Sequence, residues 1–396
     1  MKRVLKLLLA ACLSLSLVGC GSDDSDSSDT SSSDSVVFKL GGSGPLTGGA
    51  SVYGNAVKNA AEIAVEEVNA LGGIQFELNF QDDAHDTEKA VTAYGTLADW
   101  GMQVSLATVT SAPGAAVAPL YTDDTTFAIT PSGSSTAVVF QDDACTNPYG
   151  YVFQMCFTDP NQGIASADYL SEHTDIGTKV AVIYKNDDNY STGIYQKFIA
   201  EAADVDLEVV YSGSFDDSSA TDFSVQLQQA QAAGADVVFL PIYYQPASLI
   251  LTQANQMGYA PSFFGVDGMD GILSLEGFDT SLAEGVYLLT PFSADATDEK
   301  TVNFVNKYVE KYGETPNQFA ADAYDCVYAI YNALTAGEAT PDMSNAEIAD
   351  ILIEQFTSMT FDGVTGTSVT WSTTGEVSKA PKAVVIQDGV YVGVED

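Results

Sequence analysis

The feature that most constrains the fold of this chain is a repeated alternation between short apolar runs and longer amphipathic segments. Residues 180–184 and 237–240 are apolar runs of strand length, whereas residues 87–100 and 319–336 repeat apolar side chains at helical spacing. Such patterns indicate buried strands and helices, respectively. Because strands that alternate with helices form parallel sheets covered on both faces, we expect an α/β fold with helix-flanked parallel sheets.

The same alternation runs through most of the chain. Strands are expected at 36–40, 76–80, 104–107, 127–130, 180–184, 207–211, 237–240, 262–264 and 286–289. Helices are expected at 57–71, 87–100, 115–121, 192–203, 223–233, 247–257, 302–312, 319–336 and 346–356. Ligands of parallel sheets bind in the loops at the carboxyl ends of the strands. The loops that come after the strands are therefore the expected site.

The N-terminus has the pattern of a secretory signal. Lys2, Arg3 and Lys6 form a basic n-region, and residues 5–18 are apolar except for Lys6 and two serines, a run too short for a comfortable transmembrane helix. The run ends in Leu17-Val18-Gly19-Cys20, which resembles a bacterial lipobox. We predict that residues 1–19 are a signal peptide and that Cys20 is lipidated. An ordinary signal peptide that happens to contain a cysteine is the alternative.

The segment after the cysteine supports an anchored protein. Residues 21–35 contain only Gly, Ser, Asp and one Thr, so they have no apolar side chain to bury and are expected to be disordered. We predict that residues 20–35 form a tether between a lipid and a folded body. The expected location is extracytoplasmic, either anchored to the outer face of the bacterial cell membrane or in the periplasm.

Charge narrows the range of partners. Every acidic residue lies after Cys20, so loss of the signal with its three basic residues changes the formal net charge from −40 to −43. Such a surface repels phosphate backbones and anionic lipid, which argues against nucleic acid and leaves the lipid anchor as the expected membrane contact. The apolar fraction of 46% supplies a core for two domains or one two-lobed unit.

Cysteines and histidines do not form a metal-binding pattern. Cys145 and Cys156 remain after export, and we predict that they form a disulfide in an oxidising compartment. Cys326 lies on an apolar helical stripe and is expected to be a packing residue. Because His85 and His173 have no ligand-like spacing to a Cys or His, we expect neither a metal nor a cofactor.

Catalytic motifs are missing from the loops. The glycine-rich loop at residues 41–48 has Thr47 where the third glycine of a dinucleotide fingerprint belongs. The sequence contains no Walker motif, no G-x-S-x-G elbow and no H-E-x-x-H pair. We therefore expect a binding protein and not an enzyme. A hydrolase that uses scattered carboxylates is the alternative.

Small hydroxyls follow two of the expected strands. Ser111 follows the strand at 104–107, and Ser132, Gly133 and Ser134 follow the strand at 127–130. Backbone N–H groups and the helix dipole converge at such strand-to-helix turns, which suits a carboxylate ligand. The alternative is that these serines only cap helices.

Several motifs then resemble the leucine/isoleucine/valine-type solute-binding proteins of ABC importers. They are Gly44-Pro45-Leu46-Thr47-Gly48, Tyr53-Gly54-Asn55, Ala64-Val65-Glu66-Glu67-Val68-Asn69, Gly72-Gly73-Ile74, Asp82-Asp83-Ala84, Ile129-Thr130-Pro131-Ser132, Phe157-Thr158-Asp159-Pro160-Asn161-Gln162-Gly163 and Gly265-Val266-Asp267-Gly268. The match covers about residues 36–390, and its specificity lies in the order and spacing of these motifs.

The resemblance implies a type-1 periplasmic binding protein fold, in which two Rossmann-like lobes enclose the ligand in the cleft between them. Three crossovers would join the lobes near residues 153–159, 289–293 and 362–365. The first lobe would then comprise residues 36–156 and 291–362. The second would comprise residues 157–290 and 363–396.

The resemblance also implies residue roles. Ser111, Ser132 and Ser134, with Gly133 between the last two, match the positions that hold the α-carboxylate of an amino acid, and the Ser132 carbonyl would take part of its ammonium. Asp267 matches an acidic residue that pairs with the ammonium, and its place after the strand at 262–264 supports that role.

Aromatic residues complete the implied pocket. Tyr53, Tyr190 and Tyr243 match residues that close over the ligand, and Phe319 matches a pocket wall. Ordinary half-buried tyrosines are the alternative. Some members carry a disulfide between the positions of His85 and Thr110, and that bridge cannot form here.

The expected function is capture of an L-amino acid, of branched-chain type or related, and its delivery to an ABC permease by a monomeric protein. The short Asp267 and the Ser-Gly-Ser run at 132–134 leave the side chain of the ligand open, so polar or small amino acids and a short amide are alternatives. A sensor subunit of the same fold that does not transport is a second alternative.

Overall fold

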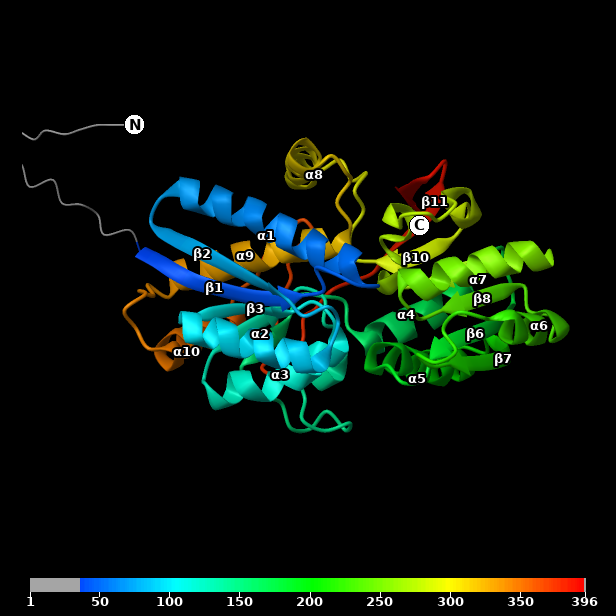
Figure 1. Ribbon diagram of the computed structural model, residues 1–396, viewed down its shortest axis with the longest axis horizontal. Coiled ribbons are helices and arrows are strands. Elements are labelled where there is room, and N and C mark those ends of the chain that lie inside the picture. Colours follow the sequence, from blue (N-terminus) through cyan, green and yellow to red (C-terminus); the bar gives the residue numbers. More distant parts are fainter. Residues whose placement is uncertain (1–35, 395–396) are drawn as a thin grey trace, which may run out of the picture. The chain divides into compact units, whose positions relative to one another are not determined.

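Two sheets, each flanked by helices, make up residues 36–394, which are the part of the chain that the computed structural model describes (Figure 1). The predicted signal peptide, Cys20 and the tether at 20–35 lie outside these residues. No helix between residues 36 and 394 has both the length and the apolarity that a membrane crossing requires.

The first sheet has five parallel strands in the order β2-β1-β3-β4-β5. Its strands are β1 Val36–Gly44, β2 Ile74–Asp82, β3 Val104–Thr108, β4 Phe127–Thr130 and β5 Val152–Gln154. Helices α1 Ser51–Leu71, α9 Gln318–Ala336 and α10 Asn345–Phe356 cover one face, and α2 Thr87–Trp100 and α3 Ser111–Asp123 cover the other. The central strands β3 and β4 are buried throughout, which explains why they are almost continuous apolar runs.

The second sheet has seven strands in the order β12-β11-β10-β9-β8-β6-β7. Its strands are β6 Lys179–Lys185, β7 Glu208–Phe215, β8 Val237–Leu240, β9 Ser262–Gly265, β10 Tyr287–Thr290, β11 Lys382–Gln387 and β12 Val390–Gly393. The strands from β6 to β10 are parallel, whereas β11 and β12 are antiparallel additions. Helices α4 Asp159–Glu172 and α5 Asn189–Asp204 cover one face, and α6 Ser224–Ala232 and α7 Tyr244–Met257 cover the other.

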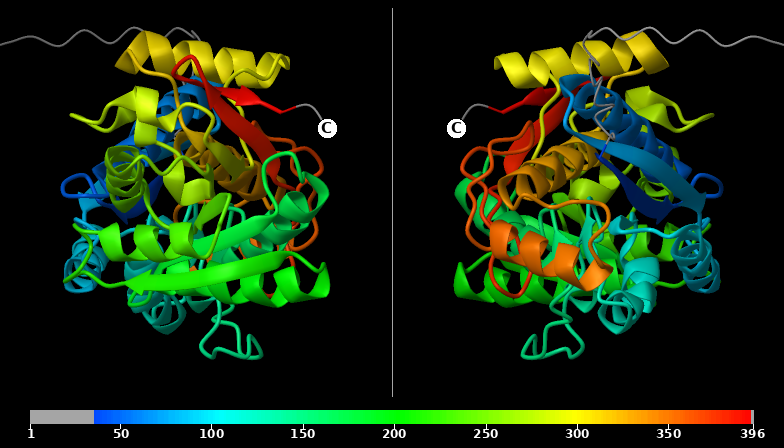
Figure 2. Two further views of the ribbon diagram at one scale, coloured as in Figure 1. Left: turned by 90° about the vertical axis from the view of Figure 1, so that its right-hand side faces the viewer. Right: turned by 90° about the vertical axis from the view of Figure 1, so that its left-hand side faces the viewer.

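Local signals fix the helix ends. The Asp86 carboxylate accepts from Lys89 N–H at 2.9 Å and caps α2, which stops at Gly101 in the left-handed region with φ of 88°. Helix α8 Glu299–Tyr312 is capped by Asp298 in the same way and packs on α1 at the outside of the body (Figure 2). The predicted α/β fold is confirmed.

We call the five-stranded sheet with its helices the first half and the seven-stranded sheet with its helices the second half. The last crossover from the first half to the second lies later in the chain than the sequence suggests. Residues 363–377, assigned above to the second lobe, contribute Val369, Trp371 and Val377 to the core beneath the first sheet. Trp371 Nε1 donates to Gln154 O at 2.8 Å, which ties the segment to β5. The chain enters the second sheet only at Lys382, the start of β11.

The predicted disulfide is wrong, because Cys145 and Cys156 are both free thiols. Cys145 lies on an exposed loop that folds back on itself, since Gln141 N–H donates to Asn147 O and Tyr149 N–H to Val139 O. Figure 2 shows this loop, in teal, projecting from the body. Cys156 is buried just beyond β5. The buried Cys326 is the packing residue that its helical stripe predicts.

Candidate functional site

A small pocket lies where the loops after β3, β4 and β9 meet the first turns of α1, α5 and α9. Six predicted site residues line it together with three that the sequence did not indicate. The lining residues are Tyr53, Val109, Thr110, Ser132, Tyr190, Tyr243, Asp267, Gly268 and Phe319. Ser111, Gly133 and Ser134 are buried but are not among the lining residues.

Asp267 is the carboxylate of the pocket. It is 3% exposed and opens the short 3₁₀ turn Asp267–Met269 directly after β9 and Val266. Its backbone N–H donates to Gln162 Oε1 at 3.3 Å, and its Oδ1 accepts from the Tyr190 hydroxyl at 2.5 Å. Burial raises the pKa of Asp267 to about 7, against the lowering effect of these hydrogen bonds. A cation beside this carboxylate would keep it ionised.

Two tyrosines converge on the backbone of Gly268 from different helices. The Tyr190 hydroxyl accepts from Gly268 N–H at 2.9 Å, and the Tyr53 hydroxyl donates to Gly268 O. Tyr53 also accepts from Tyr244 N–H at 3.3 Å, so α1 of the first half is bonded to two loops of the second. A Cβ atom on Gly268 would lie 2.5 Å from the Tyr190 hydroxyl, which explains the glycine.

Aromatic rings form the apolar wall. The Tyr53 ring lies 5.3 Å from the Tyr243 ring and 4.3 Å from the Phe319 ring, and Tyr190 lies 5.0 Å from Tyr243, between ring centroids. These four residues are therefore a contacting cluster and not separate surface tyrosines. Burial raises the pKa values of Tyr53 and Tyr190 well above the ordinary range, so both hydroxyls keep their protons.

The strand-end serines do not act as helix caps. Ser111 is the first residue of α3, and its Oγ accepts from Ser135 N–H at 3.2 Å. Ser132 Oγ donates to Val109 O, so toward a ligand this hydroxyl is an acceptor. The Ser134 hydroxyl is buried and has no hydrogen-bond partner of good geometry among residues 36–394. The capping alternative does not describe these three side chains.

Helix α3 presents an N-terminus without a side-chain cap. Its N-cap residue, Thr110, makes no capping bond, because its Oγ1 pairs with His85 Nδ1 at 2.9 Å. The first N–H groups of this 13-residue helix directly follow the pocket residue Thr110 and lie at the positive end of the helix dipole. This terminus and Asp267 offer an anion site and a cation site to one ligand.

Gly133 shapes the loop between the serines. Its N–H donates to Thr130 Oγ1 at 2.8 Å, and its carbonyl accepts from Gln154 Nε2 at 2.8 Å. A Cβ atom would lie 2.9 Å from Thr130 Oγ1, so a larger residue would disturb the turn. Gly133 thus positions Ser132 and Ser134.

Asp159 is a buried acid that sequence reasoning did not single out. Its N–H donates to Ser134 O at 3.0 Å, and its two carboxylate oxygens are buried without a hydrogen-bond partner of good geometry among the described residues. Burial raises its pKa well above the usual range. Because Asp159 precedes Pro160 in the first turn of α4, the sequence pattern at this position indicates only the start of a helix.

A buried ion pair lies behind the pocket. Lys379 Nζ lies 2.5 Å from Asp322 Oδ1 and donates to Thr365 Oγ1 at 2.6 Å, with both charged side chains 1% exposed. Asp322 is one turn beyond Phe319 on α9, and its charge adds to the rise in the pKa of Asp267. The pair therefore links the last crossover to the pocket wall.

The outer part of the cleft is wider and carries charged side chains among apolar ones. It is lined from the first half by His85 and from the second by Lys185, which pairs with Asp187 at 2.7 Å and Asp217 at 2.9 Å. Within residues 36–394, no group of three or more acidic, His or Cys side chains is placed to hold a metal ion.

Comparison with known proteins places these features in a family. A sequence model described as periplasmic binding protein matches residues 37–389. The leucine-, isoleucine-, valine-, threonine- and alanine-binding protein of Pseudomonas aeruginosa is 25% identical over 310 residues, which are 77% of this chain and 80% of that protein.

Solved structures agree in fold. The branched-chain amino acid transporter substrate-binding protein LivJ of Streptococcus pneumoniae, crystallised with isoleucine, is 27% identical with a TM-score of 0.78, over 90% of this chain and 100% of that one. A solute-binding protein of an ABC transporter from R. palustris, in complex with benzoate, has a TM-score of 0.77 at 17% identity, over 90% of this chain and 95% of that one. The second likeness shows the fold alone.

Proposed function

Because the chain belongs to the periplasmic binding protein family, we propose that it is the solute-binding subunit of an ABC importer and that it captures an L-amino acid as a zwitterion. The observation that carries the proposal is the pairing in one buried pocket of an acid, Asp267, with the uncapped N-terminus of α3. An α-amino acid has the ammonium and the carboxylate that these two groups complement.

The ammonium would lie against Asp267. The carboxylate of this residue accepts from the Tyr190 hydroxyl and its backbone N–H donates to Gln162, so its position does not depend on the ligand. The Ser132 hydroxyl is a second acceptor, since its own proton goes to Val109 O. The Ser132 hydroxyl would therefore contact the ammonium, whereas the family resemblance implies that it contacts the carboxylate.

The ligand carboxylate would lie at the start of α3. The Ser134 hydroxyl has no hydrogen-bond partner of good geometry among residues 36–394, and the Ser111 hydroxyl can donate because its Oγ accepts from Ser135 N–H. Together with the N–H groups of the first turn, these donors complement a carboxylate more fully than hydroxyls alone.

Closure of the two halves would remove both charged groups from water. Tyr53 bonds across the cleft to Gly268 and Tyr244, so the closed form is held partly by the protein itself. A buried charge without its partner is costly, so a ligand that lacks either the ammonium or the carboxylate is rejected.

The apolar wall favours an aliphatic side chain. Val109, Tyr53, Tyr243 and Phe319 line the pocket, and their apolar surfaces suit an aliphatic group. The names of the relatives, which include leucine, isoleucine, valine and alanine binding, support this class.

Two alternatives differ from the importer in the step after ligand binding. A sensor subunit would use the same pocket and report ligand to a receptor, and the presence of a neighbouring permease gene distinguishes the importer from it. An enzyme is disfavoured because the relatives are binding proteins and because the pocket has no nucleophile paired with a base. We expect the protein to act as a monomer.

Family membership implies an extracytoplasmic location, and the N-terminal sequence supports a lipid anchor. The expected result is that Cys20→Ser releases the protein from the cell surface or blocks processing of the signal peptide. A Cys20→Ser variant that is processed normally and stays on the membrane would show that the anchor is not a lipid on this residue.

Identification of retained ligand tests the function. Native mass spectrometry of the purified protein, followed by denaturation and analysis of the released small molecule, is expected to yield an aliphatic amino acid. Release of a solute without an ammonium group would contradict the proposal.

A further inference from the structure

The loop after β2 presents His85 to the start of α3. Ala84 and His85 both have φ in the left-handed region, at 50° and 59°, which is uncommon for residues other than glycine. The buried carboxylate of Asp83 holds this turn, because it accepts from His85 N–H at 2.9 Å and from the Ser43 hydroxyl at 3.0 Å. The backbone of His85 is therefore fixed by the protein itself.

The His85 ring has one contact in each half of the protein. Its Nδ1 pairs with Thr110 Oγ1 of the first half at 2.9 Å, and its ring lies edge-on to the Tyr243 ring of the second half, with 5.5 Å between the centroids. Burial lowers the pKa of His85, and the charge of Lys185 lowers it further, so the imidazole is mostly uncharged at neutral pH. Closure of the halves therefore adds a second support to a ring that already holds Thr110.

Few N–H groups are available at the start of α3. Gly114 N–H donates to the carbonyl of the N-cap residue at 2.9 Å, and Pro113 has no N–H. Burial raises the pKa of the Tyr243 hydroxyl, and the Ser111 N–H lies close enough to this hydroxyl to oppose the rise. Ala112 N–H is therefore the remaining donor of the first turn.

A threonine at the N-cap ordinarily accepts a hydrogen bond from the N–H of the second or third helical residue with its own side-chain oxygen. In α3 the third residue is Pro113, so a capping Thr110 would take the Ala112 N–H. Thr110 makes no such bond, because its hydroxyl pairs with His85. The pairing with His85 thus decides whether the helix terminus is capped by the protein.

We infer that His85 is a positioning residue of the amino-acid pocket: it holds the Thr110 hydroxyl away from the α3 terminus and so leaves the Ala112 N–H to the ligand carboxylate. The inference rests on the proposed function for the ligand, whereas the missing cap is a property of the protein alone. Without His85, the Thr110 hydroxyl would compete with the carboxylate for the same N–H.

Two substitutions separate the hydrogen bond of His85 from its ring. His85→Phe keeps a ring beside Tyr243 but cannot bond to Thr110, whereas His85→Asn keeps a polar atom for Thr110 and adopts a left-handed φ readily. Titration calorimetry with leucine at pH 7.5 should show a loss of affinity of about fivefold in His85→Phe, the effect of one threonine cap, and of less than about twofold in His85→Asn. Wild-type affinity in His85→Phe would overturn the inference.

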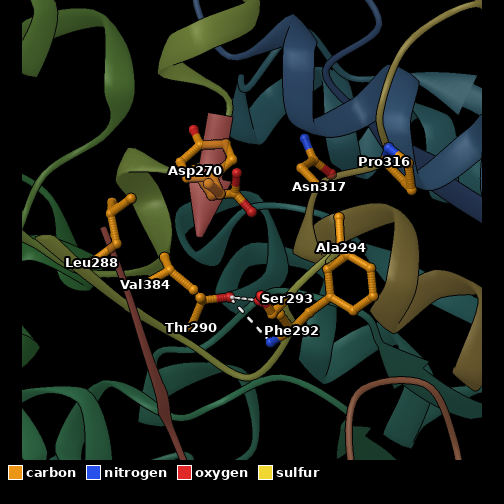
Figure 3. Close-up of a pocket in the computed structure, with 10 residues that line it drawn as sticks. Asp270, Leu288, Thr290, Phe292, Ser293, Ala294, Pro316, Asn317 and Val384 are labelled. Atoms are coloured by element: carbon orange, nitrogen blue, oxygen red, sulfur yellow. Dashed lines mark hydrogen bonds between the residues drawn. The ribbon is translucent and has the colours of Figure 1, made fainter. Parts of the chain in front are cut away.

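A double-mutant cycle with Thr110→Val tests whether capping causes the loss. Because valine has no hydroxyl, His85→Phe should change the affinity less than about twofold in the Thr110→Val background. Thr290→Val is the matched control, since the Thr290 hydroxyl is also buried at a strand end but accepts from Phe292 N–H at 3.3 Å, at the crossover after β10 (Figure 3). His85→Phe should keep its full effect in that background. A loss that persists in Thr110→Val would assign the effect to packing of residue 85 and overturn the inference.

Hydrogen exchange of the Ala112 amide, measured without ligand, tests the inference independently of the proposed function. Exchange should slow about fivefold in His85→Phe and return to the wild-type rate in His85→Phe/Thr110→Val. An unchanged rate in His85→Phe would overturn the inference even if leucine binds. Expected exchange rates in a protein that does not bind leucine would support the role of His85 at the helix terminus and contradict the proposed ligand.

Discussion

The Tyr190 hydroxyl donates to Asp267 Oδ1 at 2.5 Å and accepts from Gly268 N–H at 2.9 Å. One phenol therefore fixes both the acid of the amino-acid pocket and the backbone of the turn that carries it. Hydrogen bonds to charged groups contribute about 1.5–3 kcal/mol.

Tyr190→Phe should weaken leucine binding about tenfold or more, because Asp267 loses the donor that positions and ionises it. Tyr184→Phe is the matched control, since Tyr184 stacks on Tyr195 in the same half and does not line the pocket. Titration calorimetry compares the two variants with the wild type. Equal affinities in all three would mean that the Tyr190 contact has no role in binding.

Binding should depend on pH through Asp267. Its pKa is about 7 without ligand, and only the carboxylate attracts an ammonium, so affinity falls as the pH drops below 7. Leucine affinity at pH 6 is expected to be about tenfold lower than at pH 8, from the ionised fractions at these two pH values. In Asp267→Asn this dependence should disappear; a variant that keeps the full slope would assign it to another group.

The buried pair of Lys379 and Asp322 should matter for stability. Lys379→Met leaves Asp322 without its partner and should lower the free energy of unfolding by about 3 kcal/mol. Lys307→Met, which breaks an exposed pair with Glu67, should cost under about 1 kcal/mol. Urea unfolding measures both. If the double variant Lys379→Met/Asp322→Leu were no more stable than Lys379→Met, the unpaired charge would not be the cause.

Thiol labelling should separate the two cysteines near the first crossover. Iodoacetamide added to the folded, unreduced protein should label the exposed Cys145 and spare the buried Cys156, and denaturation without reductant should expose both. Mass spectrometry of peptides provides the readout. If Cys145 and Cys156 became labelled only after reduction, the two residues would form a disulfide and their assignment as free thiols would be wrong.

The fold followed from the sequence where the apolar pattern or the end signals of an element were clear. The apolar strand 237–240 matches β8, and helix 87–100 matches α2, whose Asp and Gly ends are visible in the sequence. Helix α4 and the β11–β12 hairpin were not predicted. Helix α4 opens with Asp-Pro-Asn-Gln-Gly and has little apolar periodicity, and the hairpin depends on antiparallel pairing with β10.

The sequence predicted which loops form the candidate pocket, but it did not predict which groups donate and which accept the hydrogen bonds there. Asp267 follows a short strand between two glycines, and the structure places it in the pocket. The donor role of Ser132 toward Val109 O and the pairing of Thr110 with His85 depend on residues more than twenty positions away, which local patterns do not reveal. The burial of Asp159 and Asp270 depends on contacts with the other half of the protein, through Ser134 O and Gln318 N–H respectively.

The most direct test of amino-acid capture compares L-leucine with 4-methylpentanoate, which lacks only the ammonium, by titration calorimetry on the wild type and Asp267→Ala. Leucine should bind the wild type, and Asp267→Ala should lose about 2–5 kcal/mol, roughly thirtyfold to several thousandfold in affinity. The pentanoate should bind the wild type at least about a hundredfold more weakly than leucine does. Equal binding of leucine and the pentanoate, or an Asp267→Ala variant with wild-type affinity, would contradict recognition of a zwitterion through Asp267.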